Sequence, residues 1–346
     1  MKRSGLWAMN LAVSLLTAGA TLAEQPKPPL EPVSNNELHR AAREGRLDAV
    51  RQMLERDPAA VNMVDSLGQA PLHAAIEGRK LEVVKLLLDK GADTNIKTVH
   101  QQDTPLHLAL YRREREIAIL LLDNAADATA VNKKGIYPLI WAGMQAMPDI
   151  IEKLQAKGAQ FNKKDGTTSE MLYSMANACP PATAQEFKKT VDILVASGGD
   201  VNFKGSTGRA PLFALVYSSP WSSKSGKERI GLADALVAHD ADVNARNKDG
   251  VTPLIWAASR GNKDVVEWLL QHGADIKAKE TTRGWTALHL AAINRQKEVV
   301  ELLLEKGADT KILDAEGLTP LGAALKYKSI ETAAILERKM KKEKIK

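Results

Sequence analysis

Residues 285–309 read WTALHLAAINRQKEVVELLLEKGAD and divide into two short amphipathic helices followed by a glycine stop. Thr286 begins the first helix, whose alanines and leucines form a small, close-packing face. After a polar turn at residues 294–296, the second helix carries valine and leucine at helical spacing. Gly307 follows where a helix must end in a left-handed residue, which glycine adopts without a Cβ penalty. Such a pair cannot bury its own apolar face, so it needs copies on both sides.

The chain supplies eight further copies of this pair, which we call units and number one to nine from the N-terminus. Their first helices are predicted to start at Asn36, Ala70, Thr104, Tyr137, Ser169, Ala210, Thr252, Thr286 and Thr319. Successive starts lie 32 to 34 residues apart, except for intervals of 41 and 42 residues on either side of Ala210. Gly-Ala-Asp or a related triplet follows five starts by 21 residues, at Gly91, Ala125, Gly158, Gly273 and Gly307.

The recurrence of Thr-Pro-Leu-His and Gly-Ala-Asp in phase, with a period near 33, resembles the ankyrin repeat. The resemblance covers about residues 34–339 and implies an all-α solenoid of about nine helix-turn-helix units with short β-hairpin loops. We assign the repeat domain to residues 34–337. The first and last units depart from the pattern and carry polar outer surfaces, as expected of capping units.

The first 23 residues have the layout of a secretory signal peptide. Lys2 and Arg3 precede an uncharged, mostly apolar stretch that ends in small residues, with cleavage expected after Ala23 or, alternatively, near Ala20. The competing interpretation is an uncleaved membrane anchor, because the apolar stretch is almost long enough to span a bilayer. Residues 24–33 form a proline-rich linker. The single cysteine, Cys179, precludes an internal disulfide, and we expect a periplasmic or secreted protein.

The net charge is +6, and removal of Lys2 and Arg3 with the signal leaves about +4. Much of this excess lies in residues 338–346, which we assign as a basic C-terminal tail. A basic tail can bind nucleic acid or anionic lipid, but it can equally keep the last helix soluble. No aromatic residues interleave with the tail, so the tail lacks a surface on which bases could stack, and we expect no nucleic-acid partner. We also expect no stable membrane insertion once the signal is cleaved.

Two insertions interrupt the period in the middle of the chain. They occupy roughly residues 176–187 in unit five and 218–230 in unit six, and explain the two long intervals. Both fall between the paired helices, so they are expected to emerge side by side. Insertions on one face of a solenoid often mark a binding surface. Trp221 in the second insertion is therefore a candidate contact residue, with packing onto Tyr217 as the equally weighted alternative.

A second candidate surface is implied by the resemblance, because partners of ankyrin proteins commonly contact the loop tips and the inner helices. Residues of interface-prone type on these two features are the further candidates. Together with Trp221, the predicted partner-binding residues are Tyr111, Arg112, Met144, Tyr217 and Trp285. Trp141 and Trp256 occupy one phase of the repeat and either line the same groove or pack between helices.

The sequence contains little that indicates catalysis. His39, His73, His107 and His289 share the fourth position of the helix-start motif, where the resemblance implies a hydrogen bond to the neighbouring loop. No two histidines have zinc-ligand spacing, and neither a nucleophile elbow nor a phosphate loop is present. We therefore predict no catalytic, cofactor-binding or metal-binding residues.

The favoured function is an exported, monomeric, non-catalytic module that binds a protein partner through its concave and loop surfaces. The first alternative is a periplasmic inhibitor or immunity-type protein that neutralises a toxin or lytic enzyme. The second is a membrane-surface scaffold that uses the basic tail. The partner's identity does not follow from the sequence, because a fold of this kind serves many targets.

Overall fold

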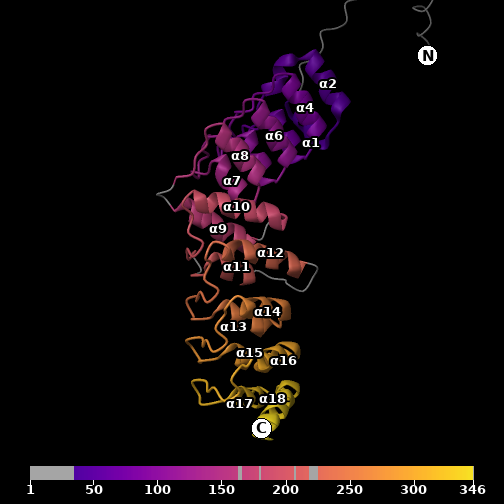
Figure 1. The fold of residues 1–346 in the computed structure, drawn as a ribbon. Helices are drawn as coiled ribbons and strands as arrows, with labels where there is room; N and C mark the ends of the chain where they lie inside the picture. The colour runs from indigo at the N-terminus through magenta and orange to yellow at the C-terminus, as the bar shows by residue number, and fades with distance from the viewer. Residues whose placement is uncertain (1–34, 163–165, 179–180, 206–207, 218–224, 346) are drawn as a thin grey trace, which may run out of the picture.

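The structure is a computed structural model that describes residues 35–162, 166–178, 181–205, 208–217 and 225–345. These residues form 18 α-helices, two for each predicted unit (Figure 1). The first helices of the units are α1 (Asn35–Glu44), α3 (Pro71–Glu77), α5 (Pro105–Tyr111), α7 (Pro138–Met144), α9 (Thr167–Ala178), α11 (Pro211–Tyr217), α13 (Pro253–Arg260), α15 (Ala287–Ile293) and α17 (Pro320–Lys326). The second helices are α2 (Leu47–Arg56), α4 (Leu81–Asp89), α6 (Arg115–Asp123), α8 (Pro148–Ala156), α10 (Ala184–Ala196), α12 (Ser225–Val237), α14 (Lys263–Gln271), α16 (Lys297–Glu305) and α18 (Ile330–Ile345).

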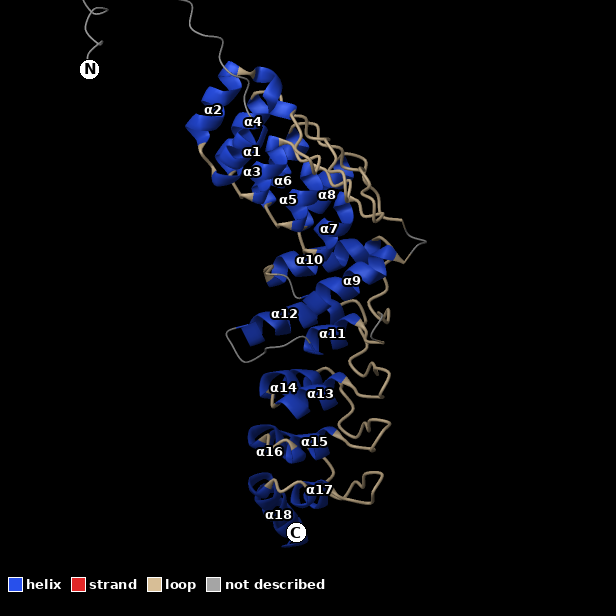
Figure 2. Ribbon diagram, turned by 180° about the vertical axis from the view of Figure 1, so that it is seen from behind, coloured by secondary structure: helices blue, strands red, loops and turns tan. Residues whose placement is uncertain are grey.

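The helix pairs stack in a single row, as the repeat predicts. Each first helix packs on the first helices of adjacent units, from α1 on α3 to α15 on α17, and the second helices form a parallel row. The loops that precede the first helices project on one side along the row (Figure 2). Alanines and leucines between adjacent pairs form one continuous buried core, which supplies the apolar burial that no pair achieves alone.

Unit three shows how the motif sets the helix bounds. The Thr104 hydroxyl accepts a hydrogen bond from the His107 N–H, and Pro105 occupies the first helical position, where a missing N–H costs nothing. Helix α16 ends at Glu305 with Lys306 as its C-cap, and the next residue, Gly307, has φ 84°. The predicted glycine stop is therefore confirmed.

The predicted β-hairpin loops turn back on themselves but form no strands within the described residues. In the loop before α3, the Asp65 N–H donates to the Gln69 carbonyl at 2.9 Å. This single backbone hydrogen bond closes the turn but is not enough to form a β-ladder. Adjacent loops are also joined, since the Val99 N–H donates to the Leu67 carbonyl at 2.9 Å. Turns in adjacent loops are thus joined to one another by backbone hydrogen bonds along one side of the row.

Part of each insertion lies in helices. Helix α9 has 12 residues and includes residues 176–178, and α10 has 13 residues and includes residues 184–187, against 7 and 9 residues for the two helices of unit two. Helix α12 likewise has 13 residues and contains residues 225–230 of the second insertion. The row changes direction near α9 and α10 (Figure 1), where both helices of one unit are longer than those of unit two.

The residues assigned to a basic tail continue the last helix, because α18 extends to Ile345. The boundary predicted at residue 338 falls inside this helix. Arg338 and Lys342 line a shallow hollow together with Glu301 and Glu305 of α16, so part of the basic charge lies beside acidic residues of the same chain. None of the described helices combines the length and apolar character needed to cross a bilayer.

Candidate functional site

The loops and the first helices line one side of the row (Figure 2), which we call the concave face. Histidines at the fourth motif position fix the loops to the helices in units one, two, three and eight. Their Nε2 atoms lie within hydrogen-bond distance of the carbonyl before the next helix start: His39 to Gln69 (2.7 Å), His73 to Asp103 (3.4 Å), His107 to Ile136 (3.0 Å) and His289 to Leu318 (3.1 Å). The predicted structural role of these histidines is confirmed.

Burial favours the neutral form of His73, His107 and His289. Nδ1 of His107 accepts from the backbone N–H of Thr104 at 3.3 Å, so the proton sits on Nε2 and is donated to the Ile136 carbonyl. Burial, which disfavours the charged ring, lowers the pKa of His73, His107 and His289 below the usual value despite the carbonyl contacts.

Units two to four leave the concave face hollow. One cavity of about 230 Å³ is lined by Tyr111 and Trp141, and a second of about 190 Å³ adjoins it on the side of unit two. Gln101, Asp103 and Leu108 line both cavities, so the two are continuous. The Tyr111 side chain is 59% exposed and meets the Trp141 ring edge-on at 5.1 Å.

Units six and seven carry a stack of aromatic and arginine side chains on the same face. The Arg209 guanidinium carbon lies 3.5 Å from the centre of the Tyr217 ring. Tyr217 stacks on Trp256, with ring centres 4.4 Å apart, and Arg260 lies over Trp256 at 4.7 Å. We call these four residues the arginine–aromatic stack.

A smaller cluster of the same composition occupies units eight and nine. Arg283 lies over the Trp285 ring at 4.6 Å and donates to the Tyr327 hydroxyl at 3.0 Å. The Glu280 carboxylate positions this loop by accepting the backbone N–H groups of Arg283 (2.6 Å) and Trp285 (3.1 Å). Burial would raise the pKa of Glu280, but these N–H donors outweigh it and lower the pKa.

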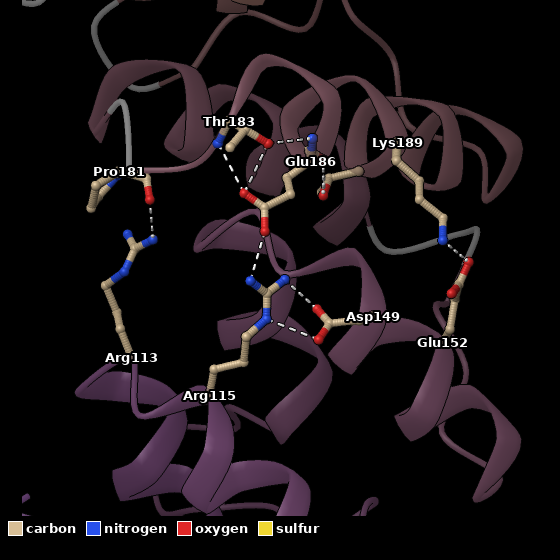
Figure 3. A network of polar contacts seen from close by, with 9 residues as sticks. Arg113, Arg115, Asp149, Glu152, Pro181, Thr183, Glu186 and Lys189 are labelled. Atoms are coloured by element: carbon tan, nitrogen blue, oxygen red, sulfur yellow. Dashed lines mark hydrogen bonds and ion pairs between the residues drawn. The ribbon is translucent and has the colours of Figure 1, made fainter.

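An ion-pair network joins units that are not adjacent (Figure 3). Arg115 of unit three pairs with Asp149 of unit four at 2.5 Å and with Glu186 of unit five at 2.6 Å. Hydrogen bonds from Thr183, followed by the Arg115 pair, lower the pKa of Glu186. The longer α10 makes this contact possible, because its extended N-terminus reaches beyond the neighbouring unit. We call the network of Arg115, Asp149 and Glu186 the unit-five bridge.

The structure places most predicted partner-binding residues on the concave face, but it does not gather them into one site. Tyr111 lines the cavity of units three and four, Tyr217 belongs to the arginine–aromatic stack, and Trp285 belongs to the cluster in units eight and nine. Met144 is half-buried against the core, and Arg112 is half-buried with an Nε that makes no hydrogen bond to a described residue. Trp221 lies outside the described residues.

Arg209 lies at a predicted loop tip and Arg260 on a predicted inner helix, but neither was among the six residues singled out as contacts, although both belong to the arginine–aromatic stack. The sequence contained a signal for Arg260, which follows Trp256 by four residues and therefore shares its helix face. For Arg209 the contact depends on how a loop approaches Tyr217, and spacing does not encode this. Over the described ranges, no three histidine, cysteine, aspartate or glutamate side chains group to hold a metal ion.

Comparison with protein families agrees with this geometry. Family models described as ankyrin repeats match residues 12–98, 101–133 and 223–304, which together exceed half of the chain. The chain belongs to the ankyrin-repeat family. Ankyrin repeats are characteristically non-catalytic protein–protein interaction modules, which agrees with the lack of catalytic motifs in the sequence.

The curated relatives of this ankyrin-repeat chain include a toxin, a Notch protein and a viral protein. It is 33% identical over 135 residues to alpha-latrocrustotoxin-Lt1a of Latrodectus tredecimguttatus, covering 38% of this chain and 8% of the toxin. It is 34% identical over 128 residues to the neurogenic locus Notch protein of Drosophila melanogaster, covering 37% of this chain and 4% of Notch. An ankyrin repeat protein of fowlpox virus is 40% identical over 145 residues, which is 40% of this chain and 38% of the viral protein. The chain thus spans less than a tenth of the first two relatives.

Proposed function

We propose that this ankyrin-repeat chain is an exported module that binds one protein partner across its concave face. The observation that supports the proposal best is the distribution of Tyr111, Trp256, Arg260 and Trp285, which brings interface-prone side chains to one face of a continuous row. Because the continuous core holds the loops and helices in place, little conformational entropy is lost on binding.

Export is the second part of the proposal and rests on the sequence of residues 1–23. The matching experiment is N-terminal sequencing of the protein recovered from the producing cell. We expect the mature chain to begin at Glu24. A chain that retains Met1 would contradict cleavage and favour the anchor interpretation.

Site-specific photo-crosslinking tests the binding surface. Tyr111 replaced by p-benzoylphenylalanine keeps an aromatic ring at an exposed position of the concave face, and the same replacement of Arg51 on α2 places the probe on the second-helix side. Irradiation in the producing cell is expected to yield a protein adduct from position 111 and none from position 51. Equal adducts from both positions, or none from either, would overturn the proposal.

A further inference from the structure

The arginine–aromatic stack presents cationic groups that no carboxylate of the described chain neutralises. Tyr217 has Arg209 at 3.5 Å and Trp256 at 4.4 Å from its ring centre. Two groups so close to one ring must lie on opposite faces, so both faces of Tyr217 are covered. Among the described residues, neither Arg209 nor Arg260 forms an ion pair, and the buried Nε of Arg209 makes no hydrogen bond.

The acidic groups on the neighbouring loops are already engaged. Glu280 accepts three backbone N–H groups, from residues 282, 283 and 285. Asp314 accepts from the Trp285 indole at 3.1 Å, and Glu316 pairs with Lys326. Asp249 accepts only a long hydrogen bond, 3.4 Å, from Asn247. The concave face of units six to eight therefore has guanidinium donors available and most of its carboxylates occupied.

We propose that the arginine–aromatic stack binds carboxylate side chains of an extended acidic segment in the protein partner. This inference rests on the proposed function and specifies the chemistry of the partner. A guanidinium that lies flat on a ring keeps its N–H donors at the edge, where a carboxylate accepts two of them. Stacking also fixes the arginine before binding, which reduces the entropy lost when the carboxylate arrives.

The repeat predicts the spacing of these carboxylates. Arg209 and Arg260 belong to the adjacent units six and seven, whose packed helices lie about 8–10 Å apart. An extended chain rises about 3.3 Å per residue, so side chains three residues apart are separated by about 10 Å. The segment that fits therefore carries two carboxylate side chains three residues apart.

The same geometry favours a peptide over single-stranded nucleic acid. Base recognition requires a free aromatic face on which a base stacks. Tyr217 has no free face, and Trp256 is covered by Tyr217 and approached by Arg260. The groups left for a ligand are guanidinium edges, which carboxylates satisfy without displacing the rings.

Fluorescence anisotropy with the full chain tests the inference. The probe is a labelled twelve-residue peptide with glutamate at every third position and glycine or serine between. Peptides with four adjacent glutamates, with lysine in place of glutamate, and a twelve-base oligothymidylate are compared. We expect the spaced glutamate peptide to bind best, and the Arg209→Gln/Arg260→Gln variant to bind it about tenfold or more weakly, because hydrogen bonds to charged groups are lost.

Two variants control for charge and for folding. Arg51→Gln removes the same charge from an exposed position of α2 and is expected to leave binding unchanged. Arg260→Gln alone changes an exposed side chain at the end of α13, so it reports on the site even if the double variant does not fold. Equal losses for Arg51→Gln and Arg260→Gln would show diffuse electrostatic attraction and overturn the inference. Tighter binding of the oligothymidylate, dependent on the same arginines, would also overturn it.

The two proposals fail separately. If position 111 gives a crosslinked partner but the spaced glutamate peptide does not bind, the acidic-segment inference is wrong and the protein-binding function stands. If the peptide binds through the stack but no crosslinked partner forms at position 111, the proposed concave-face function is wrong. Competition of the peptide with the crosslinked partner links the two, and we expect the adduct to decrease as the peptide is added.

Discussion

Units one to three and units six to seven fix the same concave face by different means. In the first group, a buried histidine of each unit bonds to the next loop, as His107 does to the Ile136 carbonyl. In the second group, the histidine position holds Phe213 or Ile255, and the arginine–aromatic stack lies across the two units instead. The first region has cavities beside Tyr111, whereas the second carries stacked aromatic and arginine side chains. One backbone repeat therefore supports two surfaces with different side chains.

The largest expected effect that separates these regions is the loss of Trp256. Trp256→Ala removes a stacked ring and a cation–π contact, and we expect a loss of about 2–3 kcal/mol in the free energy of unfolding. Trp141 occupies the same position in unit four but meets only the edge of Tyr111 in an aromatic pair. Trp141→Ala is expected to cost about 0.5–1 kcal/mol less, because Trp141 keeps an aromatic pair but has no cation–π contact among the described residues.

Urea denaturation followed by circular dichroism measures both substitutions under the same conditions. The difference between the two variants is the informative quantity, since both remove a ring of equal size. Equal losses would mean that the arginine–aromatic stack adds nothing to the packing of units six and seven. The two regions would then differ in side-chain geometry but not in the stability that their tryptophans contribute.

The next effect is a pH dependence confined to the units that contain buried histidines. Burial holds the pKa of His73, His107 and His289 below the unfolded value of about 6.5. Below that pH the unfolded chain binds more protons than the folded chain, so stability falls as the pH is lowered. In the neutral ring, Nδ1 of His107 accepts a hydrogen bond from the Thr104 N–H. Protonation would place a second N–H at Nδ1, so this hydrogen bond would be lost.

Hydrogen exchange at pH 7.5 and 5.5, expressed as protection factors, separates the regions. We expect protection to decrease in α3, α5 and α15, and to change less in α11 and α13. Asp127 and Asp314, whose pKa values are lowered, stay charged throughout this range. His107→Gln keeps a donor but cannot titrate, so it is expected to flatten the pH dependence in α5. A uniform decrease along the row would contradict the assignment.

The sequence predicted the row, the nine helix pairs and the histidine bonds because all of them follow from local spacing that recurs with the period. It failed where a side chain or a helix depends on a distant partner. The length of α10 is set by Thr183 at its start and by the Arg115 pair, 71 positions away in the chain. The arginine–aromatic stack likewise depends on how the Arg209 loop meets Tyr217, and neither residue has an unusual sequence context.

A smaller effect concerns the unit-five bridge, which lies between the two regions and joins unit three to units four and five. Arg115→Gln leaves Asp149 and Glu186 without their shared cation. Because Arg115 is 40% exposed, we expect a loss of only about 1 kcal/mol. Lys189→Gln removes a neighbouring ion pair with Glu152, at 2.7 Å but more exposed, and is the matched control with a smaller loss (Figure 3).

The informative readout for Arg115→Gln is cooperativity. The bridge spans unit four, so its removal is expected to let the regions before and after unit five unfold at different denaturant concentrations. Tryptophan fluorescence, which includes Trp141 on one side and Trp256, Trp268 and Trp285 on the other, would then diverge from circular dichroism. Coincident transitions in the variant would show that the apolar core alone couples the two regions.

The smallest expected effect belongs to a feature that the two regions share. Asn95 and Asn244 occupy corresponding positions, and each amide bridges to the next unit: Asn95 accepts from the Asp127 N–H and Asn244 from the Asp275 N–H, both at 2.8 Å. Because both side chains lie near solvent, replacement of either by alanine is expected to cost about 0.5–1 kcal/mol. Near-equal losses in urea denaturation would show that the backbone repeat is energetically uniform, so that the two regions differ only in their concave side chains. A clearly larger loss for Asn95→Ala would show instead that units one to three depend more on the asparagine contacts between units. The two regions would then differ in how their units are held together as well as in their concave side chains.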